Sequence, residues 1–205
     1  MKRFHAEWLR FRMRHDETLI LAPRGHGKST ILTVAYGLWR AVQNPDRRIL
    51  IVSATAAQAR AFLREIKMHV EGNPRFIRAF GELAGEKWTE NEIILKSRRR
   101  IAKEATVTAL GVGGPVIGRH YDIVMLDDVV DEDGASSEHM REKLFTWYRK
   151  VLLPCREPRG ELHLVGTRYH PRDLYGALIE SARSIAVFPE ETPPPNEDAS
   201  RKRDR

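Results

Sequence analysis

The residues with the clearest chemical potential lie in a glycine-containing segment near the start of the chain. The segment at 22–30, Ala-Pro-Arg-Gly-His-Gly-Lys-Ser-Thr, follows an apolar run and opens a stretch with a helical pattern. Gly25 and Gly27 would let backbone N–H groups turn inward around phosphate oxygens, and the helix N-terminus adds positive potential. Lys28 supplies a point charge for β- and γ-phosphates, and Ser29 a hydroxyl for Mg²⁺. The segment therefore predicts a binding site for ATP and Mg²⁺.

The spacing of this segment matches the P-loop pattern G-x-x-x-x-G-K-[ST], except that Ala22 replaces the leading glycine. The alternative interpretation is a Gly-rich turn that only joins a strand to a helix. The strand before it, the helix after it and the two spaced glycines favour nucleotide binding. The residues expected to contact the nucleotide are Arg24, Gly25, His26, Gly27, Lys28, Ser29 and Thr30, although the imidazole of His26 is assigned no chemistry of its own.

Two adjacent acids supply the second element that a P-loop requires. Asp127 and Asp128 directly follow the apolar run Ile-Val-Met-Leu at 123–126. Asp127 is predicted to hold the Mg²⁺ shell with Ser29, and Asp128 to orient and deprotonate the attacking water. Alternatively, the two carboxylates only cap the next turn. Hydrolytic P-loop proteins usually place the longer Glu after the metal-binding Asp, so another nearby acid could act as the base: Asp131, Glu132 or Asp133.

The surrounding segments alternate between strand-like and helix-like patterns. Apolar runs rich in β-branched residues predict strands at 18–22, 48–53, 106–110, 123–126, 162–165 and 185–188. Helices are expected between them, at 28–43, 56–71, 138–153 and 171–183. Because these runs are continuously apolar, the strands should be buried on both faces. The pattern predicts an α/β three-layer sandwich with a mainly parallel sheet and helices on both faces, as in P-loop NTPases of the ASCE type.

Two segments depart from this alternation. Residues 92–96 and 101–110 flank 97–100 and predict a β-hairpin at the edge of the sheet. Residues 189–205 contain four prolines and no large apolar residue, which is typical of a disordered linker or tail. We therefore expect one ATPase domain over residues 1–188, followed by a charged, Pro-rich tail over 189–205.

Composition excludes several other classes of protein. Among 205 residues, the single cysteine, Cys155, allows no internal disulfide and no multi-cysteine metal site. No apolar run approaches the roughly 20 residues that span a bilayer, and the N-terminal segment lacks the apolar core of a signal peptide. A net charge of +7 favours polyanionic partners. The acid-free basic run at 94–103 is interpreted either as a nucleic-acid contact or as a solvated hairpin tip.

Several ordered motifs resemble one family, the ATPase motor of the large terminase subunit of tailed double-stranded DNA phages and prophages. The pieces are P-R-G-x-G-K-S-T at 23–30, S-A-T followed by A-x-Q-A at 53–59, a Gly-rich segment ending in G-R at 111–119, and G-T-R-x-H-x-x-D-L-Y-G at 166–176. Their order and spacing carry the resemblance, which spans about residues 4–179. It implies an ATP-hydrolysing motor that translocates double-stranded DNA into a procapsid.

The resemblance also implies roles for individual residues. Arg24 would sense the γ-phosphate from within the loop. Thr167 would belong to the coupling motif that relays loss of the γ-phosphate to the rest of the motor. Arg119 would be an arginine finger acting in trans on a neighbouring subunit. The alternative for Arg119 is a local salt bridge, with Asp122 as the expected partner.

Two features of the family are missing from the sequence. The segment Phe4-His5-Ala6-Glu7-Trp8 lacks the Gln of an adenine-contacting motif, so Trp8 or Phe4 either stacks on the base or packs in the core. The C-terminal RNase H-like nuclease of full-length large terminases has no counterpart here, and no nuclease activity is expected.

The family also implies partners: double-stranded DNA, a small terminase subunit, a portal protein and further copies in a ring, all in the host cytoplasm and away from membranes. Two other functions stay open on the sequence alone. One is a different nucleic-acid-dependent P-loop ATPase, such as a truncated helicase. The other is a weakly hydrolytic, nucleotide-dependent scaffold.

Overall fold

An eight-stranded sheet forms the centre of the computed structural model, which describes residues 2–180 and 186–188. The strands are β1 (Glu17–Leu21), β2 (Ile49–Ser53), β3 (Ala84–Trp88), β4 (Glu92–Leu95), β5 (Val107–Gly111), β6 (Tyr121–Asp127), β7 (Arg156–Gly166) and β8 (Ala186–Phe188). Their order across the sheet is β3-β4-β5-β2-β6-β7-β1-β8. The run from β5 to β8 is parallel throughout, while β4 is antiparallel to both β3 and β5. The predicted mainly parallel sheet is confirmed.

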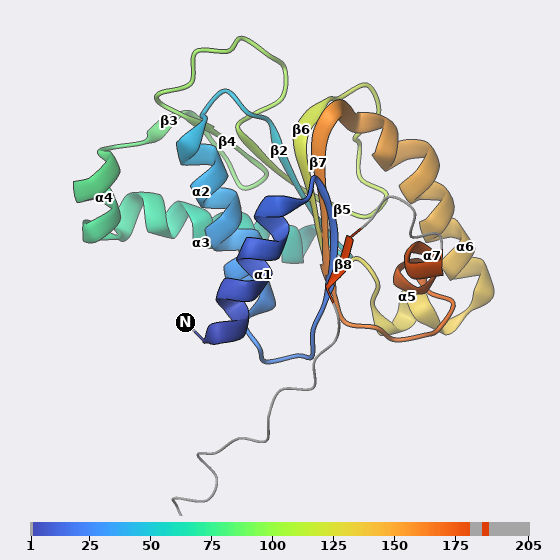
Figure 1. Ribbon diagram of the computed structural model, residues 1–205. Coiled ribbons are helices and arrows are strands. Elements are labelled where there is room, and N and C mark those ends of the chain that lie inside the picture. The colour runs from blue at the N-terminus through green and yellow to red at the C-terminus, as the bar shows by residue number, and fades with distance from the viewer. Residues whose placement is uncertain (1, 181–185, 189–205) are drawn as a thin grey trace, which may run out of the picture.

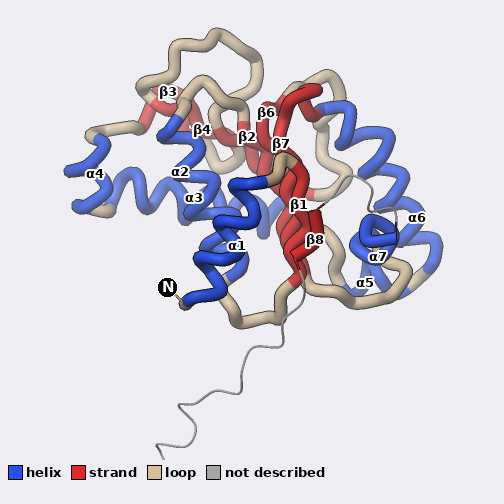
Figure 2. Tube along the Cα trace, in the orientation of Figure 1, coloured by secondary structure: helices blue, strands red, loops and turns tan. Residues whose placement is uncertain are grey.

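Helices cover both faces of the sheet (Figure 1). One face carries α1 (Arg3–Arg14), the π-helical turn η1 (Thr30–Ala35), α2 (Tyr36–Gln43), α3 (Ala56–Gly72) and α4 (Pro74–Phe80). The other face carries α5 (Glu132–Ser136), α6 (Glu138–Trp147), the π-helical turn η2 (Tyr148–Leu152), the 3₁₀ turn η3 (Leu153–Cys155) and α7 (Leu174–Glu180). Figure 2 shows the strands enclosed between these two layers. The chain therefore has the predicted three-layer α/β architecture of a P-loop NTPase.

The central strands are buried on both faces, as their continuous apolar runs predict. In β2, Ile49 and Ile51 pack in the core under α2 and α3, whereas Leu50 and Val52 pack in the core under α6 and α7. This alternation follows from the two-residue period of a strand. A smaller cluster joins Trp8 of α1 to the start of the P-loop helix.

The antiparallel edge differs in detail from the predicted hairpin. Strands β4 and β5 pair as expected, but β5 begins at Val107 rather than at residue 101. The intervening segment is tethered as a loop because a carboxylate oxygen of Asp46 accepts the backbone N–H groups of Arg99 and Arg100, each at 2.7 Å. These two bonds hold the pKa of Asp46 below its ordinary value. Strand β3, which lacks a strong apolar pattern, was not predicted.

Some helix boundaries also differ. Asn73-Pro74 follows the helix expected over 56–71, and it starts α4: the Asn73 side chain accepts the backbone N–H groups of Arg75 and Phe76, and Pro74 occupies the first turn. Helices α1 and α5 were not predicted. The last helix, expected over 171–183, begins at Leu174 and is described to Glu180, and residues 181–183 lie outside the described residues. The predicted tail at 189–205 also lies outside them.

Candidate nucleotide-binding site

The P-loop lies where the sequence places it, between β1 and the helix that begins at Lys28. Gly25 has a φ of +83° and Gly27 a φ of +68°, both in the left-handed region that favours glycine. The loop follows the carboxyl end of β1, and Asp127 occupies the carboxyl end of β6. Because both strands are parallel in one sheet, these two elements share one edge, which is where α/β folds bind ligands.

Lys28 faces the acid pair across this edge. Its buried ammonium lies 3.1 Å from an oxygen of Asp128 and donates to the hydroxyl of Thr167 at 2.9 Å. The backbone N–H of Thr167 donates to the other oxygen of Asp128 at 3.1 Å. Three residues that are far apart in the sequence therefore meet at a single point.

Asp127 is fully buried and holds two hydroxyl groups of the P-loop helix. Ser29 donates to one carboxylate oxygen at 2.9 Å, and Thr33 donates to the other. Burial raises the pKa of this carboxyl to about 6, although both hydroxyl groups act to lower it. Thr33 was missed by the sequence analysis. The signal was present, because a residue four positions after Ser29 lies on the same face of a helix.

Asp128 has an unusual backbone conformation. Its φ of +46° lies in the left-handed region, the one such value among non-glycine residues in the described part of the chain. Aspartate tolerates this region better than longer or branched side chains do. The turn directs the Asp128 side chain, which is 37% exposed, toward Lys28.

A cavity of about 480 Å³ opens between the P-loop and these acids. Its walls include predicted residues of the P-loop and Asp128, together with four residues that were not predicted as nucleotide contacts: Gln58, Val130, Asp131 and Tyr169. Gln58 belongs to the A-x-Q-A motif and Tyr169 to the G-T-R motif, so the motifs themselves were the available signal. Asp131 was considered only as a substitute base, and here it caps α5 by accepting the N–H of Gly134 at 2.7 Å.

The oxygen donors at this edge fit Mg²⁺. The hydroxyl of Ser29 and the carboxylate of Asp127 are hard ligands that lie within 2.9 Å of each other. In the described residues, no group of three or more His, Cys, Asp or Glu side chains gathers to hold an ion. A sparse protein shell suits Mg²⁺, which keeps several waters and is bound through one or two carboxylates and substrate phosphates.

Arg24 contacts Tyr169 rather than another part of the loop. Its guanidinium donates to the Tyr169 hydroxyl and lies 5.4 Å from the centre of that ring. The hydrogen bond raises the pKa of Arg24 above its ordinary value. Both residues line the cavity, so the P-loop and the G-T-R motif are joined through this pair.

Arg119, by contrast, lies away from the P-loop of its own chain. It precedes the amino end of β6, whereas Asp127 ends that strand. Its guanidinium pairs with Glu92 at 2.6 Å, so a local salt bridge exists, but the expected partner was wrong. Asp122 instead pairs with Arg48 at 2.9 Å, because Arg48 is buried beside it at the same edge.

The geometry also shows where the side chains of Trp8 and His26 lie. Trp8 is buried against Ile20 and Leu32, so it packs in the core. The ring Nδ1 of His26 donates a hydrogen bond to the carbonyl oxygen of Arg24, 3.1 Å away, and His26 is not part of the cavity lining.

Comparison with known proteins identifies the family. A family model described as "Terminase large subunit, T4likevirus-type, N-terminal" matches residues 19–194. The chain belongs to this family. The large terminase subunit of Enterobacteria phage T3 is 28% identical over 169 residues, which are 80% of this chain and 28% of that protein. The chain therefore spans just over a quarter of the length of this terminase relative.

Solved terminase structures share the fold. A variant of the large terminase ATPase domain of Thermus phage P74-26 aligns with a TM-score of 0.59 and 15% identity, covering 82% of this chain and 66% of that one. The large terminase of a thermophilic bacteriophage, solved in complex with ADP, aligns with a TM-score of 0.56 and 12% identity, covering 92% of this chain and 45% of that one. The predicted terminase resemblance is confirmed. Within the described residues, no helix combines the length and apolar character of a membrane span.

Proposed function

We propose that this terminase chain hydrolyses ATP and uses the energy to translocate double-stranded viral DNA into a procapsid. The observation that carries the proposal is the meeting of Lys28, Asp128 and Thr167 beside the buried Asp127 at one end of the sheet. A P-loop lysine, a metal-binding acid, a candidate base and a coupling residue then lie together, and the lysine and the candidate base line the cavity. The ADP complex of the thermophilic bacteriophage terminase supports a nucleotide as the occupant.

The nucleotide would replace contacts that the protein now makes with itself. Lys28 would exchange Asp128 and Thr167 for the β- and γ-phosphates, which would free Asp128 to accept a proton from the attacking water. Ser29 and Asp127 would hold Mg²⁺, which neutralises phosphate charge when bound. Arg24 would leave Tyr169 for the γ-phosphate. Thr167, released from Lys28, would transmit the change into β7.

The proposal extends to partners through the family. Double-stranded DNA, a small terminase subunit, a portal protein and a homo-oligomeric ring in the host cytoplasm are the expected setting. In such a ring, Arg119 would have to exchange Glu92 for a phosphate bound by a neighbouring subunit. Its distance from the P-loop of its own chain supports action in trans rather than in cis.

A single substitution tests the site. Lys28→Ala should reduce DNA-stimulated ATP hydrolysis by about 100-fold or more, since the lysine stabilises charge on the transferring phosphoryl group. Phosphate release with and without duplex DNA measures this effect. The matched control is Lys143→Ala, which removes an exposed lysine on α6. Undiminished DNA-stimulated hydrolysis by Lys28→Ala would refute the site assignment.

The same preparation separates the two rival functions. A truncated helicase would unwind duplex DNA when extended by its missing part, whereas a packaging motor moves along an intact duplex. A nucleotide-dependent scaffold would bind ATP tightly and hydrolyse it slowly at every DNA concentration. Stimulation of hydrolysis by unbroken duplex, without strand separation, is the expected result.

A further inference from the structure

Helix α1 contacts the P-loop segment at two places through side chains on one of its faces. The ring Nε2 of His5 lies 2.7 Å from the backbone carbonyl oxygen of His26, and the guanidinium of Arg12 donates to the carbonyl of Leu32. Trp8 packs between them against Ile20 and Leu32. Residues spaced by three and four positions share a helix face, so α1 presents all three side chains to the same neighbour.

The tautomer of His5 follows from its second hydrogen bond. The backbone N–H of Lys2 donates to Nδ1 of His5 at 3.1 Å, so Nδ1 is the acceptor. In a neutral imidazole the other nitrogen then carries the proton. His5 therefore donates from Nε2 to the carbonyl of His26.

This bond fixes the orientation of a peptide group in the P-loop. In a trans peptide, the C=O of one residue and the N–H of the next point in opposite directions, and the described residues contain no cis peptide bond. Because α1 holds the carbonyl of His26, the N–H of Gly27 points away from α1. Gly27 lines the nucleotide cavity, and its φ of +68° lies in the left-handed region that favours glycine. The hydrogen bond from His5 is thus a direct tie between α1 and this peptide group.

Arg12 holds the other end of the same segment. The N–H of Tyr36 would bond the carbonyl of Leu32 in an α-helix, but in η1 it bonds the carbonyls of Ile31 and Thr33. Arg12 takes the carbonyl of Leu32 instead, and its guanidinium is 1% exposed and lies 5.0 Å from the centre of the Tyr36 ring. Leu32 precedes Thr33, which donates to Asp127. The guanidinium thus acts on Asp127 through the helix, in addition to the direct attraction between the two charges.

We propose that α1 is a two-point brace that holds the phosphate-binding loop in its binding conformation, with His5 and Arg12 as positioning residues. This inference rests on the proposed function, because the braced amides serve a bound nucleotide. His5 sets the amide of Gly27, and Arg12 sets the turn of the helix that carries Ser29 and Thr33. Neither side chain lines the cavity.

Paired substitutions at His5 test the brace with the full 205-residue chain. His5→Phe keeps an aromatic ring against Phe4 and Trp8 but removes the donor, whereas His5→Gln restores an N–H. The dissociation constant of ADP with Mg²⁺, measured by calorimetry, should rise about fivefold to tenfold in His5→Phe, as expected for a lost hydrogen bond. In His5→Gln it should stay within about twofold of the unsubstituted chain.

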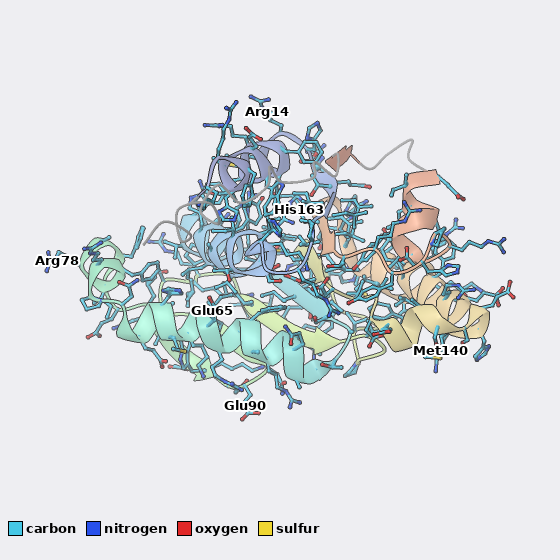
Figure 3. The ribbon with its side chains drawn as sticks, turned by 90° about the horizontal axis from the view of Figure 1, so that it is seen from below. Arg14, Glu65, Arg78, Glu90, Met140 and His163 are labelled. Atoms are coloured by element: carbon cyan, nitrogen blue, oxygen red, sulfur yellow. The ribbon has the colours of Figure 1, made fainter. Side chains whose placement is uncertain are left out.

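Arg12 gives a second pair. Arg12→Met removes the cation without leaving a buried charge, and Arg12→Lys retains a donor for the carbonyl of Leu32. We expect Arg12→Met to weaken ADP binding and Arg12→Lys to recover part of the loss. Arg14→Met is the matched control on the same helix, because Arg14 is exposed and points away from the body of the molecule (Figure 3).

The melting temperature without nucleotide separates positioning from simple stability. If His5→Phe lowers the melting temperature but leaves the ADP dissociation constant unchanged, the brace is overturned, and the same holds if both quantities are unchanged. If Arg12→Met fails to fold, the His5 pair alone decides. If the unsubstituted chain binds no ADP, the proposed function fails instead, so the two failures are distinguishable.

Discussion

At the scale of single residues, the hydroxyl of Thr33 is the contact that most refines the predicted metal site. Asp127 has no exposed surface, and each of its oxygens accepts one hydroxyl of the P-loop helix. When Ser29 turns to a metal ion, Thr33 is the remaining hydroxyl that holds the carboxylate in place. A buried carboxylate without such a partner would be costly.

Thr33→Val should therefore weaken the metal site without disturbing the fold, since valine has nearly the shape of threonine. We expect the Mg²⁺ concentration for half-maximal hydrolysis to rise about 10-fold to 100-fold, as for loss of one hydrogen bond to a charged metal ligand. A Mg²⁺ titration of ATP hydrolysis measures it. Thr146→Val, on the exposed face of α6, is the control. An unchanged Mg²⁺ requirement would assign Thr33 a purely structural role.

Residue types and spacing predicted the site where chemistry restricts the choice of side chain. A phosphate-binding lysine, a metal hydroxyl and a strand-end acid each have few substitutes, so Lys28, Ser29 and Asp127 could be assigned from the sequence. The structure places all three at one edge of the sheet. Pairings between long side chains could not be assigned, because many partners are within reach of an arginine. The Arg24–Tyr169 and Arg119–Glu92 contacts are of this kind.

At the scale of elements, a buried polar network joins α2 to β7. Arg40 and Tyr36 of α2 both donate to Glu161, with the Tyr36 hydroxyl at 3.0 Å. His163 lies two positions further along β7, donates to Glu161 at 3.1 Å and accepts from Thr18 of β1 at 2.8 Å. Figure 3 shows His163 in the interior between these elements.

This network predicts a loss of stability in mild acid. Burial, reinforced by the nearby Arg12, lowers the pKa of His163 to about 4, so the folded protein keeps the imidazole neutral. The unfolded chain binds a proton near the ordinary pKa of about 6.5. The unfolded state therefore holds more protons between these values, and the free energy of unfolding falls as pH falls from about 6.5 to about 4. This group alone contributes roughly 3 kcal/mol as an upper bound.

His163→Gln should flatten that dependence, because glutamine keeps hydrogen-bonding groups but does not titrate. Urea unfolding at pH 7 and pH 5 measures the difference in stability between the two conditions. We expect a smaller difference in the variant than in the unsubstituted chain. Burial raises the pKa of Glu161, but the hydrogen bond with His163 and the charge of Arg40 hold this pKa below its ordinary value, and the Arg40 charge is present in both proteins. Equal pH dependence would show that His163 is not the titrating group.

The strands and helices whose side chains are most completely buried were predicted most accurately from the sequence. The strands of the parallel sheet lie within two residues of the apolar runs at nearly every end, but β7 begins six residues early, at Arg156, because Arg156 still pairs with Tyr121 of β6 ahead of a register shift. Helix α1 was missed because charged residues interrupt its apolar face. Its buried side chains, Trp8 and Arg12, have helical spacing, but an arginine is not counted as a core residue when only the sequence is known.

At the scale of the whole molecule, positive charge is the property most relevant to a DNA partner. The net charge of +7 predicts that duplex DNA binds without sequence preference and that binding weakens with salt. The basic run at 94–103 starts at the end of β4 and continues as a loop from Lys96, and the side chains of Lys96 and Arg99 are exposed. The two interpretations of this run, a nucleic-acid contact and a solvated tip, predict different effects of removing its charge.

A charge-matched pair of double variants separates them. If the run contacts DNA, Lys96→Gln with Arg99→Gln should lower the affinity for duplex DNA and reduce its salt dependence by about two phosphate contacts. Arg75→Gln with Arg78→Gln removes the same charge from α4, where Figure 3 shows Arg78 at the far end of the molecule. Fluorescence anisotropy at two salt concentrations measures both. Equal losses would mean that the run is a solvated loop.

The backbone at Asp128 has a consequence for the choice of acid at this position. A left-handed φ of +46° suits aspartate, whereas glutamate would adopt it at a cost of about 1 kcal/mol. Aspartate reaches less far than glutamate, but it permits the tight turn that places the carboxylate of Asp128 beside Lys28. Extending the acid by one methylene should accordingly lower both thermal stability and turnover, while Asp128→Asn should keep the fold and abolish hydrolysis. The left-handed backbone conformation at residue 128, rather than a difference in acidity, favours the shorter side chain.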